Sequence, residues 1–435
     1  MGWLGGERHD SAVAPILEAR ACRPPETAYL LTRDAAHRQR PRLYPILAEM
    51  GLSRSPGCGI FPVATFTPPM RTRLINLLLI TCFAACGPSK PTAAQVQPQQ
   101  GPEPPVSFPL VSGQASPDDI GRFLAGMPVR RGAALSGLQQ TVEYQAHHHE
   151  MSAIWAFSTL RLDLMRSWAQ SELAPVVGSG GSVLYPFGGP DLLHVTTLFP
   201  QARTYALMGL ESVGDVPALE SMPSGEVLAV LTAFRQATRD SLQNGYFITQ
   251  DMRSDLQRSA LRGVTPILLS TVVLTGGRVE SVNGFSAGGK PGVEMCFSDT
   301  AGVSHRVCYV EGDLSNAGFS SGYRQWLAGL GGTVTYFKAA SYLMHDNAFA
   351  RSREFFLTQA RVILQDDSGI PLRCFTQDWT LRFFGNYDHP LNLFSKYQQD
   401  DLRRAYATQP TSPLPFGTGY RVSQMDGNLL LAIKH

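Results

Sequence analysis

A glycine-rich turn is the first feature of this sequence that could hold a ligand. The turn reads Tyr185-Pro-Phe-Gly-Gly-Pro-Asp191 and follows a short apolar run typical of a strand. Gly188 and Gly189 let the backbone turn sharply or approach a ligand closely, and Asp191 is placed to cap a helix behind them. Glu211 ends the next apolar run about twenty residues later, where a nucleotide-binding fold keeps the acid that binds ribose. The ligand-binding candidates of this region are Tyr185, Gly188, Gly189 and Glu211.

Two features of this turn oppose a bound nucleotide. It lacks the third glycine of the G-x-G-x-x-G pattern, and Pro190 removes one of the backbone amides that would hold a phosphate. A tight turn between a strand and a helix, with Asp191 as the capping residue, explains the same residues without any ligand. Asp191 therefore stands both as a helix cap and as a catalytic candidate.

A second group of chemically capable residues lies in Lys338-Ala-Ala-Ser-Tyr-Leu-Met-His345. Ser341 and His345 are four apart, so an α-helix would put them on one face, as a nucleophile and its base require. No G-x-S-x-G motif accompanies them, so a standard hydrolase is not supported. Downstream, Asp366 lies in Gln365-Asp-Asp-Ser-Gly-Ile-Pro371, which is either a turn or a metal-binding or catalytic segment. The catalytic candidates are Asp191, Ser341, His345 and Asp366, and Lys338 is a further ligand-binding candidate.

A histidine cluster, His147-His-His-Glu150, follows Glu143 at helical spacing. Glu143 and His147 would share a helix face, but the H-E-x-x-H zinc motif is absent, and a solvated helix face explains the cluster more simply. We therefore predict no metal site at this cluster, and the sequence identifies no cofactor.

Strand-like and helix-like segments alternate along the chain and would position these residues. Strand, glycine-rich turn, helix and strand follow one another over 182–210, which predicts a βαβ unit with parallel strands and a right-handed crossover. The pattern predicts an α/β fold with a Rossmann-like three-layer core and extra N-terminal helices. The predicted strands are 182–185, 204–210, 293–297, 305–310, 333–338 and 361–364. The predicted helices are one beginning at Ser116, then 134–172, 191–199, 224–242, 250–274, 323–330 and 349–360.

A secretory leader lies inside the chain, at 70–85. It has a basic start, Met70-Arg-Thr-Arg73, an apolar stretch over 74–80 and the end Phe83-Ala-Ala-Cys86, which resembles the lipobox of bacterial lipoproteins. That resemblance implies lipidation of Cys86. A leader must begin the chain, so we interpret residues 1–69 as an upstream extension of the gene start. Residues 86–108, rich in Pro and Gln, form a predicted disordered tether, and 109–435 a single α/β domain.

Composition narrows the class of protein further. The 435 residues are 43% hydrophobic, enough for a sizeable core, and no apolar run is long enough for a membrane-spanning helix. The net charge is only +2 with no basic cluster, so we expect no nucleic-acid partner. Cys296 and Cys308 flank a turn between two predicted strands. A disulfide between them in an oxidising periplasm and two buried thiols are both compatible with the sequence.

Several blocks of the chain resemble an uncharacterised family of exported bacterial proteins, including lipoproteins. The blocks are Tyr185–Asp191, Gly209–Glu211, Lys338–His345, Leu364–Pro371 and Pro415–Tyr420. The resemblance covers most of 140–435 and implies no known activity, so it carries no catalytic role to any residue.

Two classes of function follow from the sequence. The first is a binding or structural lipoprotein of the bacterial envelope, anchored in the membrane by its N-terminal lipid. Gly87 rather than Asp follows Cys86, and the lipoprotein resemblance then implies the outer membrane, facing the periplasm, with other envelope components as partners. The second is a periplasm-facing enzyme with a cleft formed by 185–191 and 341–345; a Rossmann-like or methyltransferase-like nucleotide binder is a weaker form of this alternative.

Overall fold

The computed structural model describes residues 108–109, 115–130, 135–244, 261–421 and 427–435. The predicted upstream extension, the leader with Cys86, nearly all of the tether and the first part of the predicted helix 250–274 lie outside these residues. The tether prediction extends one residue too far, because Phe108 already pairs with Gly284 in the sheet.

Five parallel strands form the centre of one mixed sheet of eleven strands. The order across these five is β6, β3, β2, β7, β8, and every neighbouring pair among them is parallel. Numbered along the chain, this is the order 3-2-1-4-5 of the doubly wound Rossmann-type sheet. The α/β prediction is thus confirmed, as is the parallel βαβ unit. The bounds are β2 Ser182–Tyr185, β3 Thr204–Gly209, β6 Ser304–Glu311, β7 Gly332–Phe337 and β8 Val362–Gln365.

Antiparallel pairings extend the sheet on both sides of this centre, and the short edge strand β10, Thr411–Ser412, is parallel to its neighbour β9. Next to β6 a hairpin joins β4 and β5, and next to β8 the last strand β11 lies between β8 and β9. The hairpin from β5 to β6 and its turn at 299–302 were predicted, whereas β4, β9 and β11 were not. The bounds are β1 Phe108–Pro109, β4 Arg278–Ala287, β5 Lys290–Ser298, β9 Trp379–Gly385, β10 Thr411–Ser412 and β11 Asn428–Lys434.

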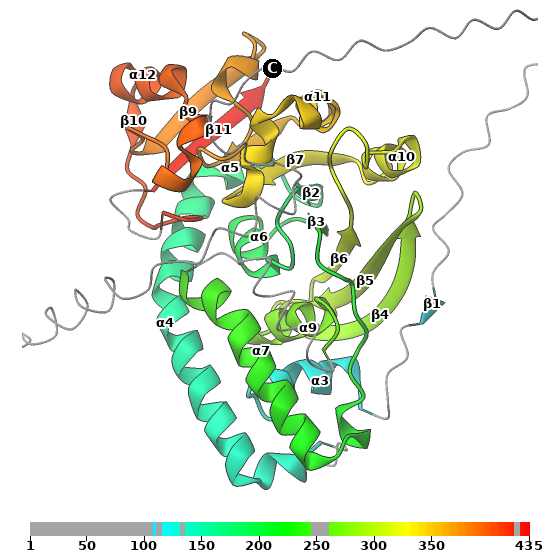
Figure 1. Ribbon diagram of the computed structural model, residues 1–435. Helices are drawn as coiled ribbons and strands as arrows, with labels where there is room; N and C mark the ends of the chain where they lie inside the picture. The colour runs from blue at the N-terminus through cyan, green and yellow to red at the C-terminus, as the bar shows by residue number, and fades with distance from the viewer. Residues whose placement is uncertain (1–107, 110–114, 131–134, 245–260, 422–426) are drawn as a thin grey trace, which may run out of the picture. The chain divides into compact units, whose positions relative to one another are not determined.

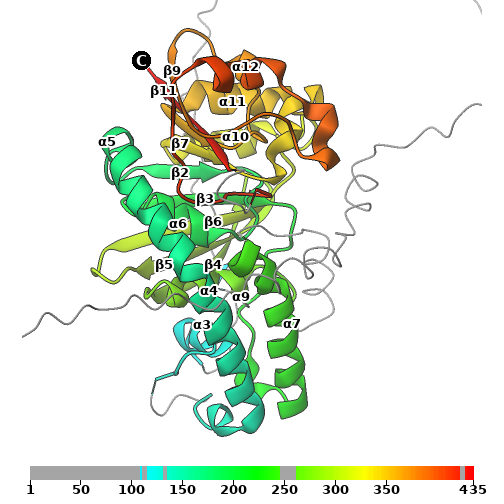
Figure 2. The ribbon, with the colours of Figure 1, turned by 90° about the vertical axis from the view of Figure 1, so that its left-hand side faces the viewer.

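Helices cover both faces of the sheet, which gives three layers (Figures 1 and 2). The side chains of β2 alternate, so that Val183 and Tyr185 enter one apolar cluster and Leu184 the other. The first cluster includes α3, α4, α6, α7 and α9, and the second includes α10 and α11. The helices are α3 Pro117–Leu124, α4 Val142–Glu172, α5 Ala174–Val177, α6 Leu192–Leu198, α7 Ser224–Asn244, α9 Thr265–Leu274, α10 Ser321–Gly329, α11 Ala350–Gln359 and α12 Asp400–Thr408.

The long helix α4 packs along α7 (Figure 1), and its apolar stripe is buried as predicted. His147 lies on this stripe and is fully buried, so the predicted solvated face is wrong for this residue. Its Nε2 is 2.9 Å from the carbonyl oxygen of Leu124, and its Nδ1 is 2.9 Å from Arg235 Nη1. His147 therefore joins α4 to α7 and to the end of α3. Glu143 is exposed and takes no part in this contact.

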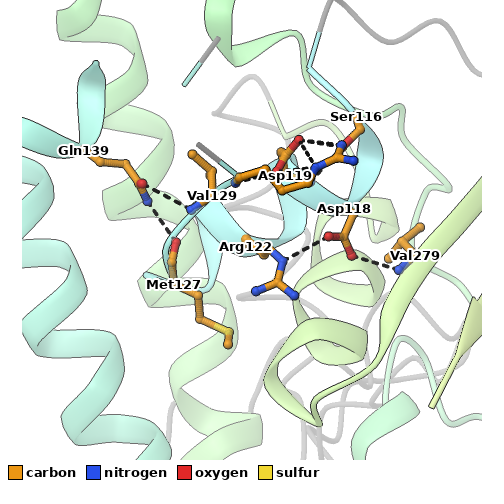
Figure 3. Close-up of polar contacts among 9 residues, drawn as sticks. Ser116, Asp118, Asp119, Arg122, Met127, Val129, Gln139 and Val279 are labelled. Atoms are coloured by element: carbon orange, nitrogen blue, oxygen red, sulfur yellow. Dashed lines mark hydrogen bonds and ion pairs between the residues drawn. The ribbon is translucent and has the colours of Figure 1, made fainter. Parts of the chain in front are cut away.

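The start of α3 follows the predicted pattern, with Ser116 as the capping residue and Pro117 in the first turn. Figure 3 shows how its acidic residues anchor the helix: Asp118 accepts hydrogen bonds from Arg122 and from the backbone N–H of Val279 in β4. These contacts tie the N-terminal helix to the antiparallel side of the sheet.

Cys296 and Cys308 are both free thiols on neighbouring strands. In the register of β5 and β6, Cys296 lies opposite Arg306 and Cys308 opposite Glu294. This diagonal placement separates Cα atoms by about 7–8 Å, more than a disulfide ordinarily spans. Of the two alternatives, the structure has the free thiols.

Candidate functional site

The segments singled out in the sequence gather at one edge of the sheet. Tyr185–Asp191 follows β2, Glu211 follows β3, Lys338 follows β7, and Asp366 follows β8. These four strands are parallel neighbours, so their carboxyl ends lie at the same edge. The chain leaves β2 through α6 on one face and β7 toward α11 on the other. The junction of β2 and β7 is therefore the switch point where open α/β sheets bind ligands.

Asp191 is the centre of the polar contacts at this switch point. It caps α6 as predicted, because its Oδ1 accepts the backbone N–H of His194 at 3.3 Å, and the ring Nδ1 of His194 is 2.6 Å from the same oxygen. Its Oδ2 accepts a hydrogen bond from the Tyr185 hydroxyl at 2.8 Å and another from Lys338 Nζ. Asp191 and Lys338 are each 3% exposed. Asp191 is thus a cap and a buried ion-pair partner at once.

Burial and charge act in opposite directions on these groups. Burial alone would raise the pKa of Asp191, but His194 and Lys338 outweigh it and hold that pKa well below its ordinary value. Burial lowers the pKa of Lys338, and it lowers the pKa of His194 to about 4. His194 is therefore neutral at pH 7, and its Nδ1–H donates to Asp191.

The two glycines of the turn make room for the protein's own side chains. A Cβ at Gly188 would lie 2.6 Å from the ring of Tyr185, and a Cβ at Gly189 would lie 3.3 Å from Oε2 of Glu211. Glu211 is 2% exposed and accepts a hydrogen bond at 3.2 Å from the Tyr309 hydroxyl. The space above the turn, where a Rossmann fold brings a pyrophosphate close to the backbone, is therefore filled by Tyr185 and Glu211.

Asp366 follows β8, which lies on the opposite side of β7 from β2 and the turn 185–191. Its Oδ2 accepts the backbone N–H of Ala339 at 2.8 Å, and its Oδ1 accepts hydrogen bonds from Ser368. A Cβ at Gly419 would touch both Asp366 Oδ2, at 2.6 Å, and Lys338 Cγ, at 3.4 Å. Burial, helped by the charge of Asp367, raises the pKa of Asp366 to about 6. This carboxyl can therefore gain and lose a proton near neutral pH.

The neighbouring carboxylate, Asp367, has a different environment that sequence reasoning missed. It accepts hydrogen bonds from the Tyr342 hydroxyl at 2.6 Å, from Arg421 Nε at 3.2 Å and from Asn428 Nδ2 at 3.0 Å. Arg421 also donates to the carbonyl oxygen of His389. These partners come from η4 (Ala340–His345), from β11 and from the loop before it, so Asp367 joins the C-terminal strands to the parallel centre.

Ser341 and His345 do not form the predicted pair. Their segment is the 3-10 helix η4, which has three residues per turn, so positions four apart point in different directions. The Ser341 hydroxyl is fully buried and its hydrogen bond, at 3.5 Å, goes to the carbonyl oxygen of Lys338. His345 lies against the rings of Tyr342 and Tyr397, and burial lowers its pKa to about 4. The prediction was wrong because it assumed an α-helix, in which positions four apart share a face.

Two residues at the switch point have strained backbones. Phe187 has φ 60° and Ala339 has φ 62°, a region that residues other than glycine rarely adopt. Phe187 belongs to the turn after β2, and Ala339 follows Lys338. Such strain persists only where the surrounding structure enforces it, and it often accompanies functional sites.

A metal-binding cluster and a membrane-spanning helix are both absent from the described ranges. No group of three or more His, Cys, Asp and Glu side chains is placed there to hold a metal ion. No helix in that part of the chain is both long and apolar enough to cross a membrane.

Comparisons with known proteins gave no match: no family model fits the chain, and no curated protein or solved structure is significantly similar to it. The resemblance to an uncharacterised exported family therefore stays a prediction.

Proposed function

We propose that this protein is a lipid-anchored component of the bacterial envelope, held through Cys86 in the outer membrane and facing the periplasm, with a binding or structural role. The proposed partners are the membrane, through the lipid, and other envelope components. One observation carries the choice of role: the ligand position of its Rossmann-like sheet is occupied by the buried Lys338–Asp191 pair and by Tyr185 and Glu211.

The charges at the start of α6 also support a binding or structural role. In a Rossmann fold the helix after the first strand points its N-terminus at a phosphate. Here the carboxylate of Asp191 takes that place at the start of α6, and Pro190 has no amide hydrogen to offer. A phosphate group at this position would have to displace the ion pair of Asp191 with Lys338, so the arrangement disfavours nucleoside phosphates as ligands.

The anchor is tested on the N-terminal peptide of protein extracted from membranes. We expect the peptide to begin at Cys86 and to carry the mass of acyl chains, and we expect Cys86→Ser to leave the protein out of the membrane fraction. Cys82→Ser is the matched control and should change nothing. An unacylated chain that begins at Met1 would disprove the anchor.

The absence of a nucleotide role is tested by thermal unfolding. A ligand that binds only the folded state raises the Tm, and the rise grows with the logarithm of the ratio of its concentration to its Kd. We expect no shift from NADH, ATP or adenosylmethionine at millimolar concentration. A shift that grows with the concentration of one of them, and that Glu211→Gln removes, would favour the nucleotide-binding alternative.

An enzyme is the second candidate, and the strained backbone at Phe187 and Ala339 beside the titratable Asp366 favours it. Asp191→Asn separates the two candidates, because an asparagine still caps α6. A variant that keeps its stability but fails to complement a deletion strain favours catalysis. Loss of stability alone does not separate the candidates, because the change also breaks the buried pair with Lys338. Full complementation by a folded variant favours the structural role.

A further inference from the structure

We propose that Lys338 and Asp191 condense into an intramolecular isopeptide bond, a covalent amide between the end of β7 and the start of α6. The bond would be a modification of the protein itself, and it does not depend on the proposed anchor or on any external ligand. The argument rests on contact, on burial, and on the groups that surround the two reacting atoms.

The first step is the contact of the reacting groups in a dry environment. Lys338 Nζ donates to Asp191 Oδ2, and the side chains of the two residues are 3% and 2% exposed. A buried pair of charges loses most of its hydration, whereas an amide is neutral. Burial also lowers the pKa of Lys338, which favours the neutral amine that can act as a nucleophile.

The second step is the stabilisation of Asp191 Oδ1, the oxygen that stays on the carboxyl carbon when the amide forms. Asp191 Oδ1 lies 3.3 Å from the backbone nitrogen of His194 and 2.6 Å from its ring Nδ1. These two N–H groups are placed as the donors of an oxyanion hole are, around an oxygen that becomes negative when the carboxyl carbon is attacked. The Tyr185 hydroxyl, 2.8 Å from Oδ2, holds the other oxygen beside Lys338.

The third step is the transfer of protons. Asp366 lies close to the Lys338 side chain, because a Cβ added at Gly419 would meet both Asp366 Oδ2 and Lys338 Cγ, and its charge acts on the pKa of Lys338. Burial raises the pKa of Asp366 to about 6, so this carboxyl can both accept and donate a proton near neutral pH. The Asp366 carboxyl is held in place by the backbone N–H of Ala339, the strained residue that follows Lys338.

The reaction then balances without any further reagent. In the minor state of the pair, which is the state that reacts, the ammonium of Lys338 has passed one proton to the carboxylate of Asp191 against the low pKa of that carboxyl, which gives an amine and an acid. The nitrogen lone pair attacks Cγ, the C–N bond forms, and the C–Oδ2 bond breaks. Nitrogen gives up a proton through Asp366, the departing hydroxyl gains one, and a single water molecule leaves. Nothing is oxidised or reduced.

Digestion of the native full-length protein with trypsin tests the bond directly. Arg166, Arg203, Arg324 and Arg351 bound the two relevant peptides. We expect a branched species in which 167–203 is joined to 325–351, at the sum of their masses less one water, and no cleavage after Lys338. Separate peptides, with cleavage after Lys338, would overturn the proposal, and this result needs no variant that has to fold.

Variants assign the roles of the surrounding groups. Lys338→Met and Asp191→Ala must each abolish the branched peptide, whereas Arg122→Met, at the partly exposed pair with Asp118, must leave it intact. Asp366→Asn should slow its appearance after a pulse of labelled synthesis by about a hundredfold or more, the usual contribution of a general acid and base. An unchanged rate in Asp366→Asn would overturn the role of Asp366 in the step.

Discussion

Two buried ion pairs lie at the same edge of the sheet, and the difference between them is the cation. Lys338 pairs with Asp191, and Arg421 pairs with Asp367; all four side chains are at most 8% exposed. A guanidinium keeps its proton under all ordinary conditions, whereas a buried ammonium can lose it. The Arg421 pair can therefore serve only as a structural contact, and only the Lys338 pair can become an amide. The two ion pairs are similarly buried, but only one of them holds a group that can react.

The largest expected effect comes from removing each cation in turn. Arg421→Met leaves Asp367 buried without its cation, which should cost about 3–5 kcal/mol of unfolding free energy. Lys338→Met should cost more, because it also removes the covalent closure of the chain between residues 147 apart; a disulfide over such a loop contributes about 4–5 kcal/mol. Urea unfolding of the two variants measures the difference. A smaller loss in Lys338→Met than in Arg421→Met would contradict the cross-link.

The next effect is a dependence of stability on pH. It is caused by Asp366, the carboxyl between the two pairs. Asp366 titrates at about 6 in the folded protein against an ordinary value of 3.8, so the folded state holds this proton more tightly than the unfolded state. Its contribution to stability, about 3 kcal/mol, is therefore complete below pH 4 and is lost as the pH rises through about 6.

Urea unfolding at a series of pH values measures this contribution. Asp366→Asn should flatten the profile between pH 4 and 6, whereas Asp401→Asn, at an acid on α12 away from the switch point, should leave it unchanged. A profile in which both variants follow the unmodified protein would show that Asp366 titrates normally.

Replacing Arg421 by lysine, which keeps the positive charge, should have a smaller effect. Arg421 uses Nε for Asp367 and Nη2 for the carbonyl oxygen of His389, and a lysine cannot reach both. Arg421→Lys should therefore lose one hydrogen bond to a charged group, about 2 kcal/mol in urea unfolding. Full stability in this variant would mean that the geometry of the guanidinium does not matter.

The smallest effect concerns the strained residue beside Lys338. Ala339 has φ 62°, which glycine adopts without penalty, so Ala339→Gly should raise the unfolding free energy by about 1 kcal/mol. Ala340→Gly, at an exposed neighbour in η4, is the matched control and should lower it by a few tenths to about 1 kcal/mol. The same change in both variants would indicate that the strain at Ala339 is not significant.

The parallel centre of the fold could be predicted because its strands are short apolar runs bounded by Gly, Pro and charged residues. β2, β3, β7 and β8 are buried on both faces, and such runs are recognisable without knowledge of their neighbours. The cap at Asp191 was predictable for a similar reason, because a cap and its helix are adjacent in sequence. In contrast, β4 mixes exposed and buried positions irregularly and was missed.

The contacts of the site could not be predicted, because they join residues that are far apart in the chain. No local pattern links Lys338 to Asp191, or Asp367 to Arg421 and Asn428. The glycines at 188 and 189 were recognised, but their purpose was not: they accommodate Tyr185 and Glu211, and sequence alone does not distinguish a side chain of the protein from a ligand. The Ser341–His345 prediction failed because the type of helix depends on the tertiary structure.

The position of β11 in the sheet has a consequence for synthesis and for gene damage. This strand, Asn428–Lys434, lies between β8 and β9, so both of these strands pair with a neighbour that is synthesised after them. Until the ribosome has released those residues, β8 and β9 both present open edges and Asp367 lacks Asn428. A stop codon before Asn428 would remove an interior strand and leave unpaired edges on β8 and β9, which could pair with other chains.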